Sequence, residues 1–551
     1  MTTAKNTQET EIIEIATDVL VIGGGYTGLK AARAIAENGF RVILADQEAA
    51  DNLNRFSLLG IAAPMENQLK ELKDAVAADE RIEFLPDADI KEAAGVTGDF
   101  TIRLTSRGEK MEKKVGAVVV ATDIVSAPLN HIYGLELSDK VLTLSDVEEK
   151  LTDAEFQNKL KSDQPAVAFL VGFAQEGNPL LMKRVLDSVL AVNEASSGGA
   201  TSYVYINDIK VAGDNLERLY KEGRDKGAIY FKLSELPAIE QQGGSPVIGF
   251  HDPVVRSDIE LDPDFVVVEE AMTANQINPE LAEILRIDLG PMGFLQTDNV
   301  HRFPVSSNRE GIYVVGSTRD IQDLSDAWTD VENTVIQLKR LLGDGTREIP
   351  KFRAVVDREK CVTCLTCYRC CPHGAIYWDD KAVISPVACQ ACGICASECP
   401  QEAIQVTGYA DDEITEKIRT AVSEVKNGAP KIIAFCCENS SLEAGKTAAL
   451  FQYQLPEGLR TIRVPCAGKV DIHYVLTALI EGADGVLVMA CHPGNCKSET
   501  GTTFARWRID NAYRMLEETG IDKNRLEFVT LASNMAPDFA KIAVEMESRI
   551  G

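Results

Sequence analysis

The chain has 551 residues, which exceeds one ordinary domain of about 100–200 residues and predicts three or four folded units. Apolar residues make up 45% of the chain and charged residues 25%, which is typical of a globular protein and excludes a fibrous or disordered class. The net charge of −28 repels phosphate backbones and anionic lipid headgroups, so nucleic acid is not an expected ligand.

The first residues are polar and acidic, and residues 1–15 are predicted to form a flexible tail without a secretion signal. Apolar runs such as residues 115–121 fall short of the roughly 18 residues that a membrane-spanning helix needs. All fourteen cysteines lie after residue 360, a placement that favours local metal sites in a reducing compartment over a disulfide framework. We therefore expect a cytoplasmic protein that reaches a membrane only through partners.

Residues 16–345 alternate short apolar runs with segments of helical length. The strand-like runs cover residues 18–22, 41–45, 117–121, 166–171, 265–268 and 312–315. Such alternation predicts a doubly wound α/β region, in which two sheets can be accommodated.

The first of these runs is followed by a GxGxxG motif formed by Gly23, Gly25 and Gly28, with Tyr26 and Thr27 between the last two. In a dinucleotide site these glycines permit a tight turn, close approach to a pyrophosphate and close packing of the next helix. Asp46 ends the second run, where a carboxylate would hold ribose hydroxyls. The alternative is a glycine-rich turn that has lost its ligand.

Two later segments resemble the flavin-enzyme "ATG" and "GxxxxGD" elements, which favours FAD over NAD. They place Ala121 and Thr122, and then Gly316 and Ser317, at the flavin. Both are imperfect, because Asp123 replaces a glycine and Ser317 replaces an acid. No second GxGxxG marks a nicotinamide site.

The whole of this region resembles the A subunits of heterodisulfide reductases, through residues 140–149, 206–210, 250–264 and 316–323. The resemblance implies a Rossmann-type FAD-binding region. Two departures matter. The family's cysteine-rich segment corresponds to residues 173–178, which hold no cysteine, so the cluster found there in the family must be absent. The family's GG-R is replaced by residues 52–55, which puts FAD contacts there in doubt.

Residues 346–410 contain an internal repeat in which CxxCxxCxxxCP occurs twice. In two-cluster ferredoxins the fourth cysteine of each motif ligates the other cluster. We therefore predict one [4Fe–4S] cluster on Cys361, Cys364, Cys367 and Cys399, and a second on Cys389, Cys392, Cys395 and Cys371. A pair of zinc sites is the alternative, although zinc gains nothing from the CP ending. Cys370 is expected to be a small buried residue. The stretch resembles the bacterial two-cluster ferredoxin domain.

Residues 411–551 return to helix–strand alternation and predict a small α/β domain with a cysteine-ligated cluster. Its cysteines follow strands, and strand ends at one edge of a parallel sheet meet in one crevice. The segment resembles the delta subunit of methyl-viologen-reducing hydrogenase, which implies a [2Fe–2S] cluster. By position the ligands would be Cys437, Cys466, Cys491 and Cys496, while a fifth family cysteine is Ser440. Zinc and buried structural cysteines are the alternatives.

The domain order is similar to that of the B subunits of quinone-interacting membrane-bound oxidoreductases and of fused forms of the heterodisulfide reductase A subunits. It implies an electron-transfer subunit with FAD, two [4Fe–4S] clusters and one [2Fe–2S] cluster. Its partners would be the other subunits of such a complex, with adenylylsulfate reductase, a hydrogenase or a formate dehydrogenase as redox partner. An electron-bifurcating hub, a conduit with a lost flavin site and a stand-alone NADH reductase are the alternatives.

Overall fold

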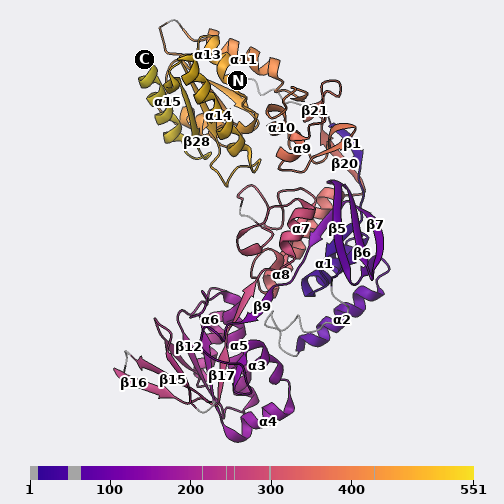
Figure 1. The fold of residues 1–551 in the computed structure, drawn as a ribbon, viewed down its shortest axis with the longest axis vertical. Coiled ribbons are helices and arrows are strands. Elements are labelled where there is room, and N and C mark those ends of the chain that lie inside the picture. Colours follow the sequence, from indigo (N-terminus) through magenta and orange to yellow (C-terminus); the bar gives the residue numbers. More distant parts are fainter. Residues whose placement is uncertain are drawn as a thin grey trace.

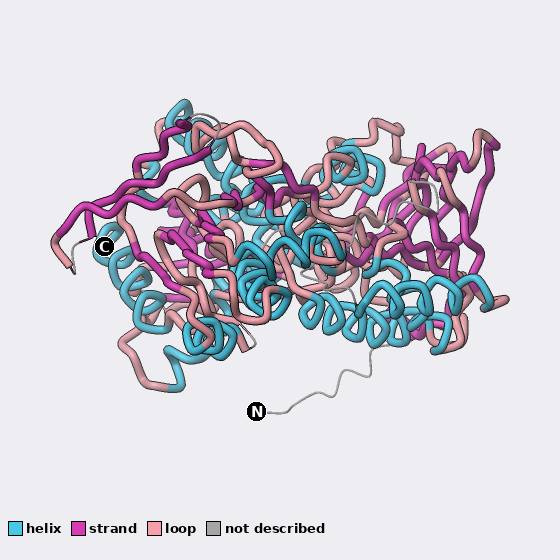
Figure 2. The backbone as a smooth tube through the Cα atoms, turned by 90° about the horizontal axis from the view of Figure 1, so that it is seen from below, coloured by secondary structure: helices cyan, strands magenta, loops and turns pink. Residues whose placement is uncertain are grey.

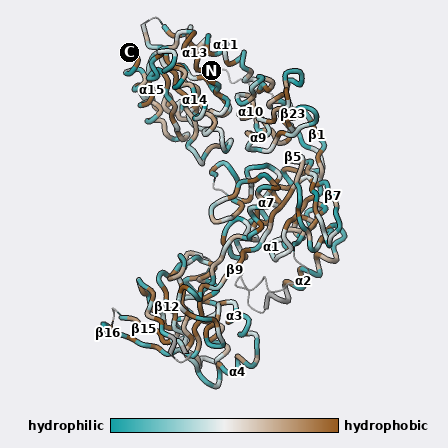
Figure 3. The backbone as a smooth tube through the Cα atoms, in the orientation of Figure 1, coloured by the Kyte–Doolittle hydropathy of each residue, from teal (hydrophilic) through white to brown (hydrophobic). Residues whose placement is uncertain are grey.

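The computed structural model describes residues 10–47, 64–213, 215–242, 245–252, 255–296, 299–426 and 428–551. The molecule is elongated and curved, and the segment around α9 and α10 lies between a central lobe and the C-terminal lobe (Figure 1). We call residues 10–350 the N-terminal region, residues 351–410 the ferredoxin-like domain and residues 411–551 the C-terminal domain. Apolar residues gather in the strands of each lobe (Figure 3).

The first sheet of the N-terminal region is parallel, with the strand order β19-β8-β2-β3-β4. Its strands are buried runs of Val, Ile, Leu and Ala, as expected when both faces of a parallel sheet are covered. They are β2 (Val19–Ile22), β3 (Val42–Ala45), β4 (Ile82–Leu85), β8 (Ala117–Val120) and β19 (Ile312–Val314).

Helices cover one face of this sheet, namely α1 (Tyr26–Glu37), α2 (Pro64–Ala78) and α8 (Leu324–Leu342). The other face packs against α7 (Asn278–Leu285) and an antiparallel meander of β5 (Ala88–Val96), β6 (Asp99–Ser106) and β7 (Glu109–Val115). Two short 3-10 turns, η2 (Pro291–Gly293) and η3 (Gly316–Thr318), complete this lobe.

The second sheet is also parallel and has the order β10-β17-β11-β12-β13. Its strands are β10 (Val141–Thr143), β11 (Ala166–Val171), β12 (Thr201–Ile206), β13 (Ile229–Lys232) and β17 (Phe265–Val268). Its helices are α3 (Leu144–Lys150), α4 (Ala154–Asp163), α5 (Pro179–Ala195) and α6 (Leu216–Asp225). An antiparallel sheet of β14 (Ala238–Gln242), β15 (Ser245–Asp252) and β16 (Ser257–Leu261) adjoins it, and the pair β9 (Val125–Pro128) and β18 (Glu270–Thr273) connects this lobe to the first.

The ferredoxin-like domain closes on itself because its first strand, β21 (Ala354–Val356), pairs with its last, β24 (Ile404–Val406). Between them lie α9 (Thr366–Cys370), the hairpin of β22 (Ile376–Asp379) and β23 (Lys381–Ile384), and α10 (Ile394–Ser397). The two halves of the internal repeat are thereby wrapped around each other, as the crossed ligation requires.

The C-terminal domain has a parallel sheet of order β26-β25-β27-β28, with helices alongside the strands, as elsewhere in the molecule (Figure 2). Its strands are β25 (Ile432–Cys437), β26 (Leu459–Val464), β27 (Gly485–Ala490) and β28 (Leu526–Thr530). Its helices are α11 (Asp411–Ser423), α12 (Ser441–Leu450), η4 (Ala467–Lys469), α13 (Ile472–Ile480), α14 (Gly501–Thr519), η5 (Lys523–Arg525) and α15 (Ala536–Ile550).

The predicted fold class is confirmed, including the two parallel sheets of the N-terminal region. One prediction is wrong in part. Residues 10–14 are not tail but strand β1 (Thr10–Glu14), which pairs antiparallel with β20 (Thr346–Pro350). Alternating residues over Thr10–Glu14 could have indicated this strand. No helix among the described residues is long and apolar enough to cross a membrane.

Candidate flavin and iron–sulfur sites

A glycine cradle lies at the carboxyl end of β2, where α1 begins. Gly23 has a φ of +113°, and a Cβ atom there would lie 2.2 Å from the carbonyl oxygen of Ala121. A Cβ atom at Gly28 would lie 1.8 Å from the carbonyl oxygen of Gly23, so both positions require glycine. Gly25 is the N-cap of α1 and has no side chain to cap the helix, which leaves its amino terminus directed at a ligand.

The remaining predicted flavin residues come to the same edge of the sheet. Asp46 follows β3, its side chain is buried, and a Cβ atom at Gly24 would lie 2.3 Å from its carboxylate. Thr122 follows β8, and its carbonyl oxygen accepts a hydrogen bond from the Thr318 hydroxyl at 3.1 Å. A Cβ atom at Gly316 would lie 2.8 Å from the side chain of Thr27. The sheet therefore brings four strand ends into one site.

A carboxylate from α8 lies where Ser317 replaces the expected acid. Asp330 accepts the backbone N–H of Gly316 at 3.1 Å and forms two hydrogen bonds with Arg319, at 3.0 and 3.1 Å. Burial raises the pKa of Asp330 against the opposing effect of Arg319. Sequence reasoning missed Asp330 because it lies outside the motif, on a helix that only the fold brings near.

The carboxylate of Asp123 lies against the cradle. A Cβ atom at Gly25 would be 2.0 Å from an Asp123 oxygen, so this acid stands beside the position that a pyrophosphate would approach. The glycine cradle and Asp46 fit a dinucleotide, while Asp123 adds a negative charge next to the phosphates. Residues 52–55, which replace the family's GG-R, lie outside the described residues.

The turn after β11, where family members carry extra cysteines, is filled by a side chain of this chain. The buried carboxylate of Glu269 accepts the backbone N–H groups of Gly172 and Ala174, each at 3.1 Å. Tyr133 donates its hydroxyl to the same carboxylate. An internal anion therefore occupies the backbone donors at the strand end, where α/β sheets often bind phosphates.

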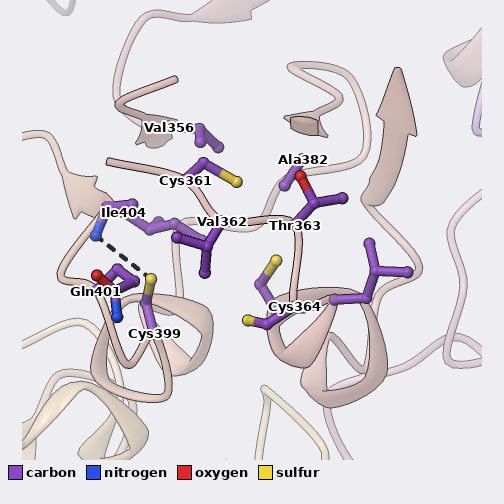
Figure 4. A pocket seen from close by; sticks show the side chains of 12 residues that line it. Val356, Cys361, Val362, Thr363, Cys364, Ala382, Cys399, Gln401 and Ile404 are labelled. Atoms are coloured by element: carbon purple, nitrogen blue, oxygen red, sulfur yellow. Dashed lines mark hydrogen bonds between the residues drawn. The ribbon is translucent and has the colours of Figure 1, made fainter. Parts of the chain in front are cut away.

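The first predicted cluster set surrounds a small pocket in the ferredoxin-like domain (Figure 4). Its lining includes Cys361, Cys364, Cys367 and Cys399, so the fourth cysteine comes from the other half of the repeat. The backbone N–H of Ala403 donates to the Cys399 sulfur at 3.3 Å. This grouping supports the crossed ligation predicted for the first cluster.

The second set is more enclosed. Burial raises the pKa of Cys395, and the neighbouring thiols of Cys392, Cys371, Cys389 and Cys370 raise it further. The first three of these neighbours are the other cysteines predicted for this cluster. Cys370 is buried and donates its thiol to the carbonyl of Cys367 at 3.5 Å, consistent with a packing role.

Neither cysteine set of the ferredoxin-like domain has the geometry of a site for a single metal ion. Within the described ranges, no three His, Cys, Asp or Glu side chains meet as they would around one metal ion. A cubane requires a wider set, because its four thiolates bind four different irons. Each set has four cysteines, three from one half of the repeat and one from the other. This type and number of ligands fits a [4Fe–4S] cluster.

The four cysteines of the C-terminal domain form a closed ring. The sulfurs of Cys437 and Cys491 are 3.6 Å apart. Hydrogen bonds from the Cys466 and Cys491 thiols lower the pKa of Cys437, and hydrogen bonds from the same two thiols lower that of Cys496. The strand ends of β25, β26 and β27 thus bring four thiols together, which suits an iron–sulfur cluster.

Positive ends of helices and polar side chains surround this ring. A Cβ atom at Gly501, the first residue of α14, would lie 2.3 Å from the Cys466 sulfur. Ser440 precedes α12; its hydroxyl is buried, has no hydrogen bond of ordinary geometry, and lowers the pKa of Cys437. Helix amino termini and hydroxyl donors stabilise negative charge, so the ring is built for thiolates.

Comparisons with known proteins agree with this division of the chain. Residues 18–82 match the family described as FAD binding domain, and residues 432–551 match methyl-viologen-reducing hydrogenase, delta subunit. The chain is 26% identical over 454 residues to the A subunit of the ferredoxin:CoB-CoM heterodisulfide reductase of Methanosarcina mazei, covering 79% of this chain and 57% of that protein. It therefore spans little more than half the length of that relative.

The C-terminal domain has a nearer relative. It is 37% identical over 121 residues to the F420-non-reducing hydrogenase vhu iron-sulfur subunit of Methanocaldococcus jannaschii, covering 22% of this chain and 90% of that protein. Among solved structures, the thioredoxin reductase of T. acidophilum aligns with 59% of this chain and 98% of its own, at 14% identity and a TM-score of 0.40.

The glycine cradle, the cysteine sets and these relatives define the class of protein: a flavin and iron–sulfur oxidoreductase similar to the A subunits of heterodisulfide reductases. Through its C-terminal domain the chain belongs to the methyl-viologen-reducing hydrogenase delta-subunit family.

Proposed function

We propose that this chain relays electrons inside a multi-subunit complex. When bound, FAD would exchange two electrons with one-electron centres, and two [4Fe–4S] clusters and a [2Fe–2S] cluster would carry single electrons. The single observation that carries the proposal is that the second cysteine set of the ferredoxin-like domain lies between the N-terminal region and the C-terminal cysteine ring.

On the N-terminal side, Val96 of β5 shares a buried cluster with Ala375 and Ala388, and Cys371 and Cys389 pack against that cluster. The contact is fixed by polar interactions nearby: the Arg286 guanidinium lies 3.9 Å from the ring centre of Tyr368 and donates to its carbonyl oxygen at 3.0 Å. Such close packing favours electron exchange between the two parts.

On the C-terminal side, the loop that carries the second set touches the turn after Cys466. A Cβ atom at Gly393 would lie 2.8 Å from the side chain of Lys469, and the Ser397 hydroxyl donates to the Lys469 carbonyl at 2.7 Å. A Cβ atom at Gly468 would lie 2.6 Å from Ile394. Only glycine permits this approach, which places η4 directly against α10.

The relatives indicate the kind of complex. One bears the name of a heterodisulfide reductase and another that of a hydrogenase, and we extend both names to this chain as a proposal. In a quinone-interacting complex, the partners would be adenylylsulfate reductase and a membrane subunit. In a complex of the heterodisulfide reductase type, the partner would be a hydrogenase or a formate dehydrogenase. The chain would then work in the cytoplasm or at the inner face of the membrane.

The test is electron transfer within the anaerobically purified full chain, mixed rapidly with sub-stoichiometric reduced methyl viologen. Cys392→Ala removes a ligand of the second set and should uncouple flavin reduction from reduction of the C-terminal cluster, which is followed by electron paramagnetic resonance. Cys370→Ala, a neighbouring cysteine outside both sets, is the matched control and should behave like wild type. Unchanged coupling in Cys392→Ala would contradict the relay.

A second candidate is an electron conduit whose flavin site has closed. The observation that favours it is the Asp123 carboxylate beside Gly25. Native protein that contains the clusters and no flavin would support this candidate over the relay from flavin.

A further inference from the structure

The two cysteine sets of the ferredoxin-like domain differ in their exposure. Cys364 of the first set is exposed and Cys361 is half-buried, whereas Cys392 and Cys395 of the second set are buried. The contacts to the N-terminal region and to the C-terminal ring both involve the loop and neighbours of the second set. The first set is therefore the one with a ligand, Cys364, exposed to solvent.

Large apolar side chains are exposed around the first set. Val362 lies between two ligands of the first set and is 60% exposed, and Trp378 on β22 is 52% exposed. Exposed Trp in particular is unusual on a surface that only meets water, and Trp is enriched among the residues that dominate protein interfaces.

The hairpin that carries Trp378 is held rigidly on the ligand loop. The Lys381 ammonium donates to the Cys361 carbonyl at 2.7 Å, and the Thr363 hydroxyl donates to the Asp380 carbonyl at 2.9 Å. The Trp378 ring packs edge-on against the Tyr368 ring, and the two ring centres are 5.1 Å apart. A surface that is fixed before binding loses little entropy when a partner docks.

The charge of the first half of the ferredoxin-like domain differs from that of the rest of the chain. Residues 351–381 carry six basic and four acidic side chains, although the whole chain has a net charge of −28. Residues 382–410, the second half, carry Glu398 and Glu402 and no basic side chain. An acidic partner would be repelled by most of the molecule and admitted at the first set.

We propose that the face formed by Arg358, Lys360, Val362, Cys364 and Trp378 is the docking surface for a small acidic one-electron carrier protein of the ferredoxin type. One electron passes between the carrier's iron–sulfur centre and the cluster on the first set; one centre is oxidised and the other reduced, with no proton or bond change. The inference rests on the proposed function for the identity of that cluster, and places the soluble carrier here and not at the C-terminal domain.

Such complexes are small and short-lived, and electrostatic attraction governs how fast they form. The expected binding is therefore weak, fast and sensitive to salt. Charge reversal within the docking surface should lower the association rate, whereas reversal on a remote surface should leave it unchanged.

The test uses the anaerobic full chain and an acidic two-cluster ferredoxin as the probe. Carboxylate-to-lysine zero-length cross-links, mapped by mass spectrometry, should involve Lys360. The double variant R358E/K360E should lower the association rate at low salt about tenfold, and Trp378→Ala should speed dissociation. Lys446→Glu, an exposed lysine on α12, is the control and should change neither.

Cross-links confined to the C-terminal domain, or equal association rates for R358E/K360E and wild type, would overturn the docking surface. So would a dimer of this chain that Trp378→Ala dissociates, because the face would then be an interface between copies. Failure here is separable from failure of the relay: the Cys392→Ala experiment uses methyl viologen and needs no protein carrier.

Discussion

Lys469 is the most consequential buried charge at the junction of the ferredoxin-like and C-terminal domains. Its side chain is 1% exposed, and its ammonium donates to the Asp411 carboxylate at 2.8 Å and to the Tyr474 hydroxyl. Lys469→Met keeps the apolar stem that packs against Gly393 and removes the charge. Asp411 then loses its cation inside the interface.

Removing one partner of a buried ion pair costs about 3–5 kcal/mol. The Asp411 side chain is 35% exposed, so water recovers part of this loss, and we expect about 2–3 kcal/mol. Since about 1.4 kcal/mol is tenfold, local opening of η4 and α10 should rise about 30- to 150-fold. Hydrogen exchange of these amides, followed by mass spectrometry on the anaerobic full chain, measures it directly.

The pH dependence follows from Asp411. Burial alone would raise its pKa, but hydrogen bonds from Lys469, Tyr474 and Gln405 hold the pKa of Asp411 below its ordinary value. A carboxyl group whose pKa is lower in the folded state contributes stability above its unfolded pKa of about 4. This stability is lost as the pH falls through the folded-state pKa. The deficit of Lys469→Met should therefore be constant across the neutral range.

Lys446→Met is the matched control, because Lys446 pairs with Glu443 at 2.6 Å where the side chains are 62% and 49% exposed. Its effect should stay below about 0.5 kcal/mol. The double variant K469M/D411N, which leaves no unpaired charge, should recover part of the loss. If Lys469→Met exchanged no faster than Lys446→Met, the reasoning about a buried junction charge would be refuted.

Three further predictions concern the cofactor sites. Ser440→Ala removes a hydroxyl beside the C-terminal ring and should lower the midpoint potential of the cluster there by roughly 60 mV, which is a tenfold change for one electron. Ser441→Ala is the control and should leave the potential unchanged, because the Ser441 hydroxyl donates to the Met489 carbonyl at 2.8 Å. Equal potentials for the two variants in an electron paramagnetic resonance titration would contradict the prediction. Asp123→Gly should tighten FAD binding about tenfold, measured by flavin fluorescence, because it removes a like charge near the pyrophosphate; weaker binding would show that the acid supports FAD. Excess NADH should not bleach the flavin, because the turn after β11 already binds its own carboxylate; rapid anaerobic bleaching would restore a nicotinamide site.

Most of what could be predicted about the ferredoxin-like domain came from the spacing of its cysteines. The repeat indicated that Cys399 joins the first set and Cys371 the second, because in two-cluster ferredoxins the fourth cysteine of each motif ligates the other cluster. The strand pair β21 and β24 brings those halves together, in agreement with that expectation. Local spacing suffices here because the ligands are close in sequence.

Contacts between distant segments could not be predicted in this way. Asp330 reaches the flavin site from α8, Glu269 fills the turn after β11 from a neighbouring strand, and Lys469 packs under Gly393. None belongs to a motif, since each depends on which elements become neighbours in space. The strand β1 was missed because β20, the strand that it pairs with, lies at the other end of the N-terminal region.

The most direct test of the account is the cofactor content of anaerobically purified native protein. Iron, acid-labile sulfide and extracted flavin are measured on one sample. Two [4Fe–4S] clusters, one [2Fe–2S] cluster and a flavin predict about ten irons and one FAD per chain. About eight irons without flavin would contradict the relay and leave a ferredoxin-like domain between two parts that hold no redox cofactor.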